Sequence, residues 1–215
     1  MGQRTAGEKM FEAYLGEQGF DVPEHEPDLG VETRPDYLVA LDGHTCLCEV
    51  KEFAPTTNSI PGSGTWAMKT VLKPIRAKVH EGARQLRPAA GLGHPLVVVL
   101  TNPHRAPVIL GDQECLWALE GDPVVRVPVG PGVAATPEHT AGRNGELRHD
   151  HPYLTAVVIL HEDLCERHDH SAMAIIPSSP VAVPIPDVFF RGPRDRVLEY
   201  SFERQAYVPV HDPSA

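Results

Sequence analysis

The sequence contains no long hydrophobic run. Its longest aliphatic stretches cover residues 96–100 and 157–160, whereas a transmembrane helix needs roughly 20 consecutive apolar residues. The N-terminal residues also lack the apolar stretch that is typical of a signal peptide. We therefore expect a soluble protein of the cytoplasm that makes no membrane contact.

Cysteine is scarce, and several common catalytic motifs are missing. The chain has 4 cysteines. Two of them, Cys46 and Cys48, are spaced as on a single β-strand, which does not suit a disulfide scaffold, so we interpret the cysteines as reduced thiols. The sequence has no Gly-x-Ser-x-Gly nucleophile elbow, no glycine-rich phosphate loop with lysine and no dinucleotide-binding fingerprint. Candidate catalytic residues must therefore come from another pattern.

Basic residues are outnumbered, but they are concentrated in one part of the chain. The 19 lysines and arginines face 29 aspartates and glutamates, and the net charge of −10 argues against a protein that coats nucleic acid through bulk electrostatics. Residues 1–50 carry 3 basic and 11 acidic residues, whereas residues 51–87 carry 7 basic and 2 acidic ones. If the protein binds the phosphates of a nucleic acid, the second segment supplies the candidate contacts, which are Lys69, Lys73, Arg76, Lys78, Arg84 and Arg87.

Local patterns predict a mixture of helices and strands. Thr5 and Glu8 form a capping-box pattern at the start of the first helix. The Asp42-Gly43 pair is a strong signal for a two-residue turn between antiparallel strands. The expected elements are helices over residues 6–18, 68–86 and 113–119 and strands over residues 36–41, 44–53, 96–100 and 154–160.

The predicted hairpin brings three charged side chains to one face. With a two-residue turn, residues whose numbers sum to 85 face each other, so Asp36 lies opposite Glu49 and Lys51 points to the same face. Directly opposed carboxylates destabilise a sheet. A divalent cation would remove this conflict, and Mg²⁺ typically takes one or two carboxylates plus water and phosphate oxygens. The hairpin therefore predicts a Mg²⁺ or Mn²⁺ site, with Lys51 beside the attacking water.

Pro35-Asp36 followed by Glu49-Val50-Lys51 resembles the PD-(D/E)xK nuclease superfamily. The resemblance covers roughly residues 5–102 and includes an earlier helix bearing Glu8 and a later helix bearing Gln85. It implies an α/β fold with a restriction-endonuclease-like three-layer core over residues 1–165, in which helices flank a mixed central sheet. Residues 166–215 are expected to form a C-terminal extension of strands and proline-rich loops packed on the same domain.

The same resemblance implies a role for each site residue. Asp36, Glu49 and the Val50 carbonyl would be metal ligands, and Lys51 would be the catalytic lysine. Glu8 would steer the attacking water, although its capping role already explains it. Gln85 would be a further catalytic residue, and an exposed helical glutamine with no chemical role is the simpler interpretation.

The expected function is metal-dependent hydrolysis of phosphodiester bonds, with DNA as the first candidate substrate and a homodimer as one arrangement for cutting two strands. An alternative is a catalytically inactive module on the same fold that binds nucleic acid or protein, which the net charge and the lack of a helix-turn-helix favour. A third interpretation is a zinc site within residues 149–170, although a solvated surface segment explains these residues more simply. The residues concerned are His149, His151, His161, Cys165, His168 and His170.

Overall fold

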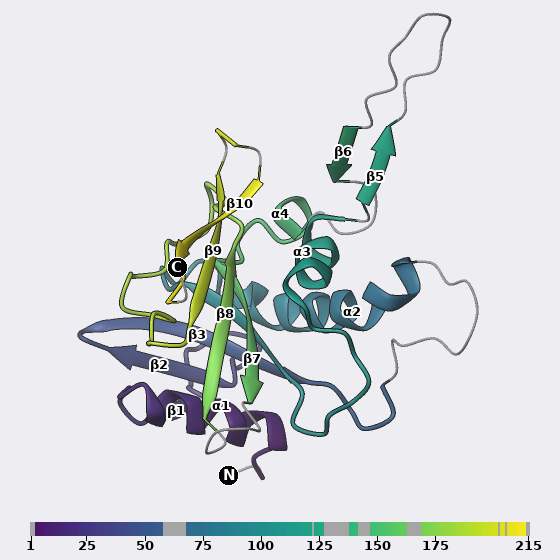
Figure 1. The fold of residues 1–215 in the computed structure, drawn as a ribbon. Coiled ribbons are helices and arrows are strands. Elements are labelled where there is room, and N and C mark those ends of the chain that lie inside the picture. The colour runs from purple at the N-terminus through teal and green to yellow at the C-terminus, as the bar shows by residue number, and fades with distance from the viewer. Residues whose placement is uncertain are drawn as a thin grey trace, which may run out of the picture.

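An eight-stranded sheet with helices on both faces forms the centre of the molecule (Figure 1). The computed structural model describes residues 3–57, 68–121, 123–126, 138–141, 147–162, 169–201, 203–204 and 206–213. The strand order is β1-β2-β3-β4-β7-β8-β9-β10, with parallel and antiparallel neighbours. The expected α/β class with a mixed sheet is therefore confirmed. In the part of the chain that is described, no helix is both long and apolar enough to cross a membrane.

The first helix begins and ends close to its predicted bounds. α1 spans Ala6–Glu17, and its capping box is complete. The Thr5 hydroxyl accepts the Glu8 N–H at 3.1 Å, and the Glu8 carboxylate accepts the Thr5 N–H at 2.5 Å. After α1, the two-residue strand β1 (Glu24–His25) forms one edge of the sheet.

The hairpin has the predicted register. β2 (Tyr37–Leu41) and β3 (His44–Glu52) pair antiparallel, with Tyr37 opposite Cys48. Asp42 and Gly43 have φ angles of 50° and 79°. Positive φ at both turn residues is the signature of a type I′ turn, which matches the twist of the two strands. The sequence pair Asp-Gly therefore sets which residues meet across the hairpin.

Three parallel strands end at one edge of the sheet. β4 (Leu96–Thr101) lies parallel to β3, and β7 (Ala156–Glu162) lies parallel to β4. We call the edge where β3, β4 and β7 end the carboxyl edge. Every residue of β4 is buried, as expected for a strand that is covered on both faces.

Three strands from the segment expected to form a C-terminal extension belong to the central sheet. β8 pairs antiparallel with β7, β9 lies parallel to β8, and β10 closes the far edge. These three strands are β8 (His170–Ile176), β9 (Arg196–Ser201) and β10 (Ala206–His211). Short strands separated by proline-rich loops carry no local signal of their partner strands, which is why the sequence did not place them in the sheet.

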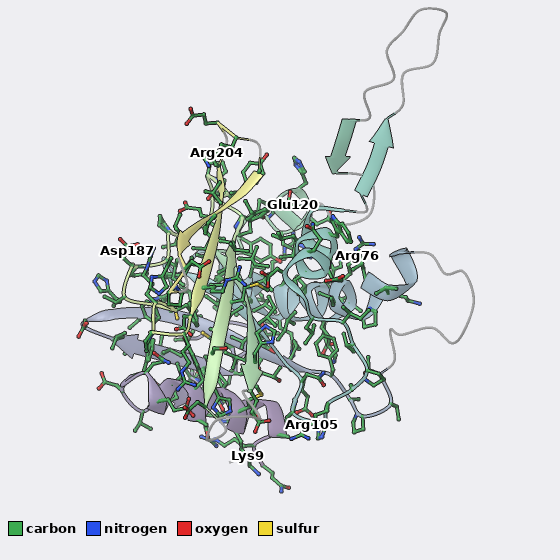
Figure 2. All side chains as sticks on the ribbon, viewed as in Figure 1. Lys9, Arg76, Arg105, Glu120, Asp187 and Arg204 are labelled. Atoms are coloured by element: carbon green, nitrogen blue, oxygen red, sulfur yellow. The ribbon has the colours of Figure 1, made fainter. Side chains whose placement is uncertain are left out.

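Helices α2 (Met68–Leu86) and α3 (Asp112–Glu120) pack on one face of the sheet. Pro74 lies inside α2 without ending it. The Arg76 guanidinium donates to the backbone carbonyls of Trp117 and Ala118 and so joins the two helices (Figure 2). The remaining elements are the 3₁₀ turn Arg87–Ala89, α4 (Leu147–Asp150), β5 (Pro123–Arg126) and β6 (Glu138–Ala141).

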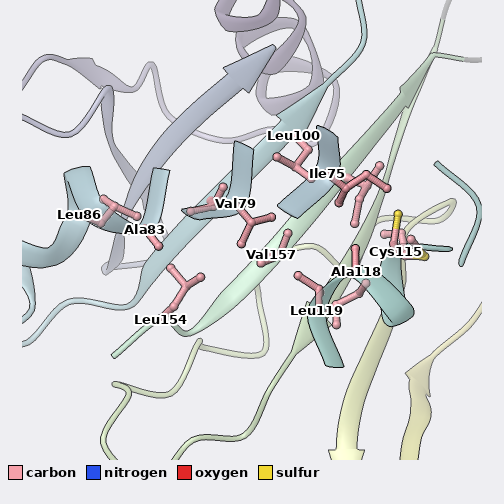
Figure 3. Close-up of a cluster of buried hydrophobic side chains, with 14 of the residues drawn as sticks. Ile75, Val79, Ala83, Leu86, Leu100, Cys115, Ala118, Leu119, Leu154 and Val157 are labelled. Atoms are coloured by element: carbon pink, nitrogen blue, oxygen red, sulfur yellow. The ribbon is translucent and has the colours of Figure 1, made fainter. Parts of the chain in front are cut away.

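The larger hydrophobic cluster lies between these helices and the sheet (Figure 3). Ile75 and Val79 of α2 are buried there with Val157 of β7. α2 approaches β4 closely at Gly82, where an added Cβ would lie 3.0 Å from both methyl carbons of Val98 and 3.4 Å from Lys51 Cγ. The absence of a side chain at Gly82 therefore lets α2 lie directly above Lys51.

A second cluster lies between α1 and the other face of the sheet, and a buried aspartate connects it to the C-terminal strands. Asp195 is fully buried and accepts hydrogen bonds from the Tyr14 hydroxyl at 2.7 Å and from the backbone N–H groups of Ala172 and Gly192, each at 2.8 Å. Asp195 therefore connects α1, β8 and the loop before β9 through hydrogen bonds.

Candidate active site

Asp36 and Glu49 meet at the start of β2, as the hairpin register predicts. The Asp36 N–H donates to Glu49 Oε2 at 3.3 Å, and the Val50 N–H donates to Asp36 Oδ2 at 2.7 Å. Each carboxylate therefore accepts a hydrogen bond from the backbone of the opposite strand. These bonds fix both side chains on the face of the sheet that α2 covers, near the carboxyl end of β3.

The surroundings make it costly to ionise both carboxylates. Glu49 has no exposed surface, and burial together with the nearby Asp36 raises the pKa of Glu49 to about 7. Burial also raises the pKa of Asp36, against the opposing effects of the Val50 N–H and Lys51. Two carboxylates whose pKa values rise because they are buried together favour a bound cation.

Lys51 is held beside the two carboxylates. Its Nζ lies 2.7 Å from Glu49 Oε1 and 3.7 Å from Oε1 of Glu81 on α2. Lys78 contacts the other oxygen of Glu81 at 3.1 Å. Burial acts to raise the pKa of Glu81, but Lys78 and Lys51 outweigh it and lower that pKa. Sequence analysis did not select Glu81, although its position four residues before Gln85 on the same helix was the available signal.

Glu8 lies on the α1 side of the same site. Its carboxylate accepts the Thr5 N–H, and its Oε1 lies 3.2 Å from Nε2 of His25. Burial opposes ionisation of Glu8, but the bonds from Thr5 and His25 prevail and lower its pKa, and its charge contributes to the raised pKa of Asp36. Glu8 is therefore an anchored carboxylate near Asp36. Sequence analysis missed His25, because a two-residue strand gives no periodic signal.

Gln85 lies at the C-terminal end of α2. Its backbone carbonyl accepts the Thr33 hydroxyl at 2.5 Å, which ties the loop before β2 to α2. Its side-chain Oε1 is buried and has no hydrogen-bond partner among the described residues. A buried amide oxygen without a partner is unusual, and it can accept a hydrogen bond from an additional donor. The structure therefore leaves Gln85 with an available acceptor, a feature that the helical pattern around it does not indicate.

The six candidate phosphate contacts occupy different environments. Arg76 is buried and binds α3, so we withdraw it as a phosphate contact. Lys78 pairs with Glu81 beside the candidate site, while Lys73 and Arg84 are exposed on α2 and Arg87 is exposed in the 3₁₀ turn that follows it. The Lys69 side chain lies outside the described residues.

The described histidines of the segment 149–170 lie in different parts of the fold. His151 lies 2.6 Å from His80 of α2, whereas His170 pairs with Glu17 of α1 at 2.7 Å, and these two helices cover opposite faces of the sheet. His161 lies on β7, and His149 is exposed. Cys165 and His168 lie outside the described residues.

The donor atoms at Asp36 and Glu49 fit a hard divalent cation. Both side chains offer carboxylate oxygens, which Mg²⁺ and Mn²⁺ prefer. Over the described ranges, no group of three or more His, Cys, Asp or Glu side chains is placed to hold a metal ion. The chain would therefore provide two carboxylates and the Val50 carbonyl, and water and substrate oxygens would complete the coordination.

Comparison of the chain with models of protein families, with curated proteins and with solved structures finds no match. Function must therefore be inferred from the geometry of the site itself.

Proposed function

We propose that the protein is a metal-dependent nuclease that hydrolyses phosphodiester bonds, with DNA as its substrate, on a restriction-endonuclease-like core. The observation that carries this proposal is the buried pair Asp36 and Glu49, with Lys51 Nζ 2.7 Å from Glu49 and the pKa of Glu49 raised to about 7. A hairpin with two carboxylates and a lysine on one face, between α1 and α2, is the arrangement that the PD-(D/E)xK resemblance implies.

Each residue of the site has a specific task in this reaction. Asp36, Glu49 and the Val50 carbonyl would hold Mg²⁺ or Mn²⁺, which when bound stabilises the charge that develops on the phosphate and makes water a better nucleophile. Lys51, fixed by its ion pair with Glu49, donates hydrogen bonds that orient the attacking water and stabilise developing negative charge. Glu8, held by Thr5 and His25, accepts a hydrogen bond from the same water.

The surface near this site supports binding of a polyanion. Lys73 and Arg84 are exposed on α2, Arg87 is exposed in the 3₁₀ turn that follows it, and Lys78 lies next to Glu81 at the site itself. Because these cations lie along α2 and the turn that follows it, and α2 passes above Lys51, a phosphate backbone can contact several of them while one phosphate reaches Lys51.

Substitution of Lys51 tests the proposal. Lys51→Ala should lower DNA cleavage in Mg²⁺ or Mn²⁺ by about 100-fold or more, while DNA affinity, measured in Ca²⁺ to prevent cleavage, stays within a few-fold. Lys9→Ala, which removes an exposed lysine of α1, is the matched control and should cleave normally. Lys51→Gln and a thermal melt of each variant separate loss of catalysis from loss of folding. Normal cleavage by a folded Lys51 variant would refute the assignment.

One observation favours the alternative of a binding module without catalysis. The Lys51–Glu49 ion pair already neutralises one of the two carboxylates, so the site can be stable without a cation. This alternative predicts DNA binding with no cleavage in any divalent cation, and with an affinity that does not change when EDTA replaces Mg²⁺.

A further inference from the structure

The carboxyl edge of the sheet holds a second feature beside the candidate active site. In open α/β sheets, ligands bind beyond the carboxyl ends of the strands. Lys51 is one residue from the end of β3, and Glu52, the last residue, lies opposite Thr101, the last residue of β4. The loop that leaves β4 at Asn102 therefore starts next to the end of β3.

This loop is held in one conformation by its own hydrogen bonds. The Asn102 side chain donates to the Ala106 carbonyl at 2.9 Å and accepts the Ala106 N–H at 2.7 Å. The Arg105 N–H donates to the Asn102 carbonyl at 3.1 Å, and Arg105 has a left-handed φ of 51°. A non-glycine residue rarely adopts this conformation unless its surroundings impose it. The loop therefore presents Arg105 from a fixed turn.

The Arg105 guanidinium is available for a ligand. It is exposed, and it makes no hydrogen bond or ion pair with any residue that the structure describes. The neighbouring His104 lies 3.6 Å from Glu52, and Glu52 also accepts the N–H of Gly7 at 2.7 Å. These contacts attach the turn both to the end of β3 and to the start of α1, which bears Glu8.

A pocket of about 380 Å³ opens beside Arg105. It is lined by apolar side chains from α1, from the β4 loop and from β7, with His161 and Glu162 supplying polar groups. A volume of this order accommodates a single nucleotide unit. The apolar lining residues are Met10, Ala106, Val108, Leu110 and Leu160.

We infer that Arg105 and this pocket form a nucleotide subsite next to the scissile phosphate. Arg105 binds a backbone phosphate adjacent to the one at Lys51, and the pocket receives the base of that nucleotide. The assignment rests on the proposed nuclease function, and it adds a substrate contact outside the hairpin and α2. Charge complementarity favours a phosphate at Arg105, because this guanidinium has no carboxylate partner among the described residues.

Arg105→Ala tests the phosphate contact, with Arg204→Ala as the matched control. Arg204 is also exposed, but Figure 2 shows it at the opposite end of the molecule from Arg105. DNA affinity is measured in Ca²⁺ across a salt series. Arg105→Ala should reduce the slope of log affinity against log salt by about 0.9, the value for one lost contact to duplex DNA, while Arg204→Ala leaves the slope unchanged.

A fluorescent base tests the pocket. A duplex carrying one 2-aminopurine, moved a position at a time, should brighten when that base leaves the stack for a pocket whose lining contains no Phe, Tyr or Trp. Val108→Phe, whose larger side chain fills part of the pocket, should abolish the signal and leave the salt slope unchanged. A thermal melt confirms that this variant folds.

The outcomes distinguish failure of the subsite from failure of the nuclease assignment. If the wild-type protein cleaves DNA but Arg105→Ala changes neither the salt slope nor the fluorescence, the subsite is overturned and the nuclease assignment stands. No DNA binding by the wild-type protein would remove both.

Discussion

Asp36→Asn should stabilise the metal-free protein, because it removes one of two buried carboxylates. At pH 8 the folded protein ionises Glu49, whose pKa is about 7 instead of the usual 4.5. A shift of this size corresponds to roughly 3 kcal/mol of lost stability. Burial is its largest cause and Asp36 the second, so removing the Asp36 charge should recover about 1 kcal/mol, or roughly 2–4 °C in melting temperature for a domain of this size. The asparagine oxygen can still accept the Val50 N–H.

Magnesium should reverse this order. A cation that binds only the folded wild-type protein adds roughly 2.7 kcal/mol at a hundredfold excess over its Kd, whereas the variant has lost one carboxylate ligand and should respond little. Thermal melts in EDTA and across a magnesium titration measure both effects. Asp42→Asn, which changes an exposed turn residue of the same hairpin to one that also tolerates a positive φ, is the matched control.

Acidic pH provides an internal check. At pH 5 the folded protein keeps Glu49 protonated, so its repulsion with Asp36 is largely absent and the gain from Asp36→Asn in EDTA should shrink. A wild-type protein that is indifferent to magnesium, or wild-type and variant melting curves that shift in parallel, would show that the two carboxylates do not share a cation.

Three further predictions follow from contacts in the fold. The part of the wild-type stability in EDTA that depends on Glu49, measured as the difference from Glu49→Gln, should fall as the pH rises from about 4.5 to about 7, because the folded state holds the Glu49 proton more tightly than the unfolded chain. Magnesium affinity should rise over the upper part of this window, since binding requires the ionised form, and calorimetry that finds no such trend would contradict the raised pKa. Asp195→Ala should cost about 3 kcal/mol in urea denaturation because it leaves the buried Tyr14 hydroxyl and two N–H groups without their acceptor, and a loss below 1 kcal/mol would refute this role. Gly82→Ala should destabilise the protein by about 1 kcal/mol or more despite the better helix propensity of alanine, because the new methyl group meets Val98, and a higher melting temperature would show that α2 can move away.

The hairpin was predictable because its information is local. Asp42 and Gly43 select a turn type, the turn sets the register, and the register decides that Asp36 meets Glu49. The same applies to α1, whose capping box is complete within four residues. The core of the candidate site therefore follows from short-range sequence chemistry.

Features that depend on distant segments were not predictable in this way. Arg76 lies on α2 with most of the other candidate phosphate contacts. Only the position of α3, some 40 residues later, shows that the Arg76 guanidinium donates hydrogen bonds to backbone carbonyls. Glu81 and His25 join the site through tertiary packing, without a motif to mark them. The C-terminal strands enter the central sheet through pairings that no local pattern specifies.

The net charge of −10 does not decide whether this protein binds DNA, because many of its charges do not face solvent as free ions. Glu8, Glu49 and Asp195 are buried and accept hydrogen bonds from within the fold. Several arginines of the C-terminal half are neutralised by aspartates, so they add little to the field that a ligand meets; these pairs are Arg191 with Asp187, Arg194 with Asp169 and Arg196 with Asp112. Lys73, Arg87 and Arg105, by contrast, are exposed and make no ion pair with a described residue. An anionic ligand responds to the local potential, so the salt dependence of binding should follow these few cations and not the total charge.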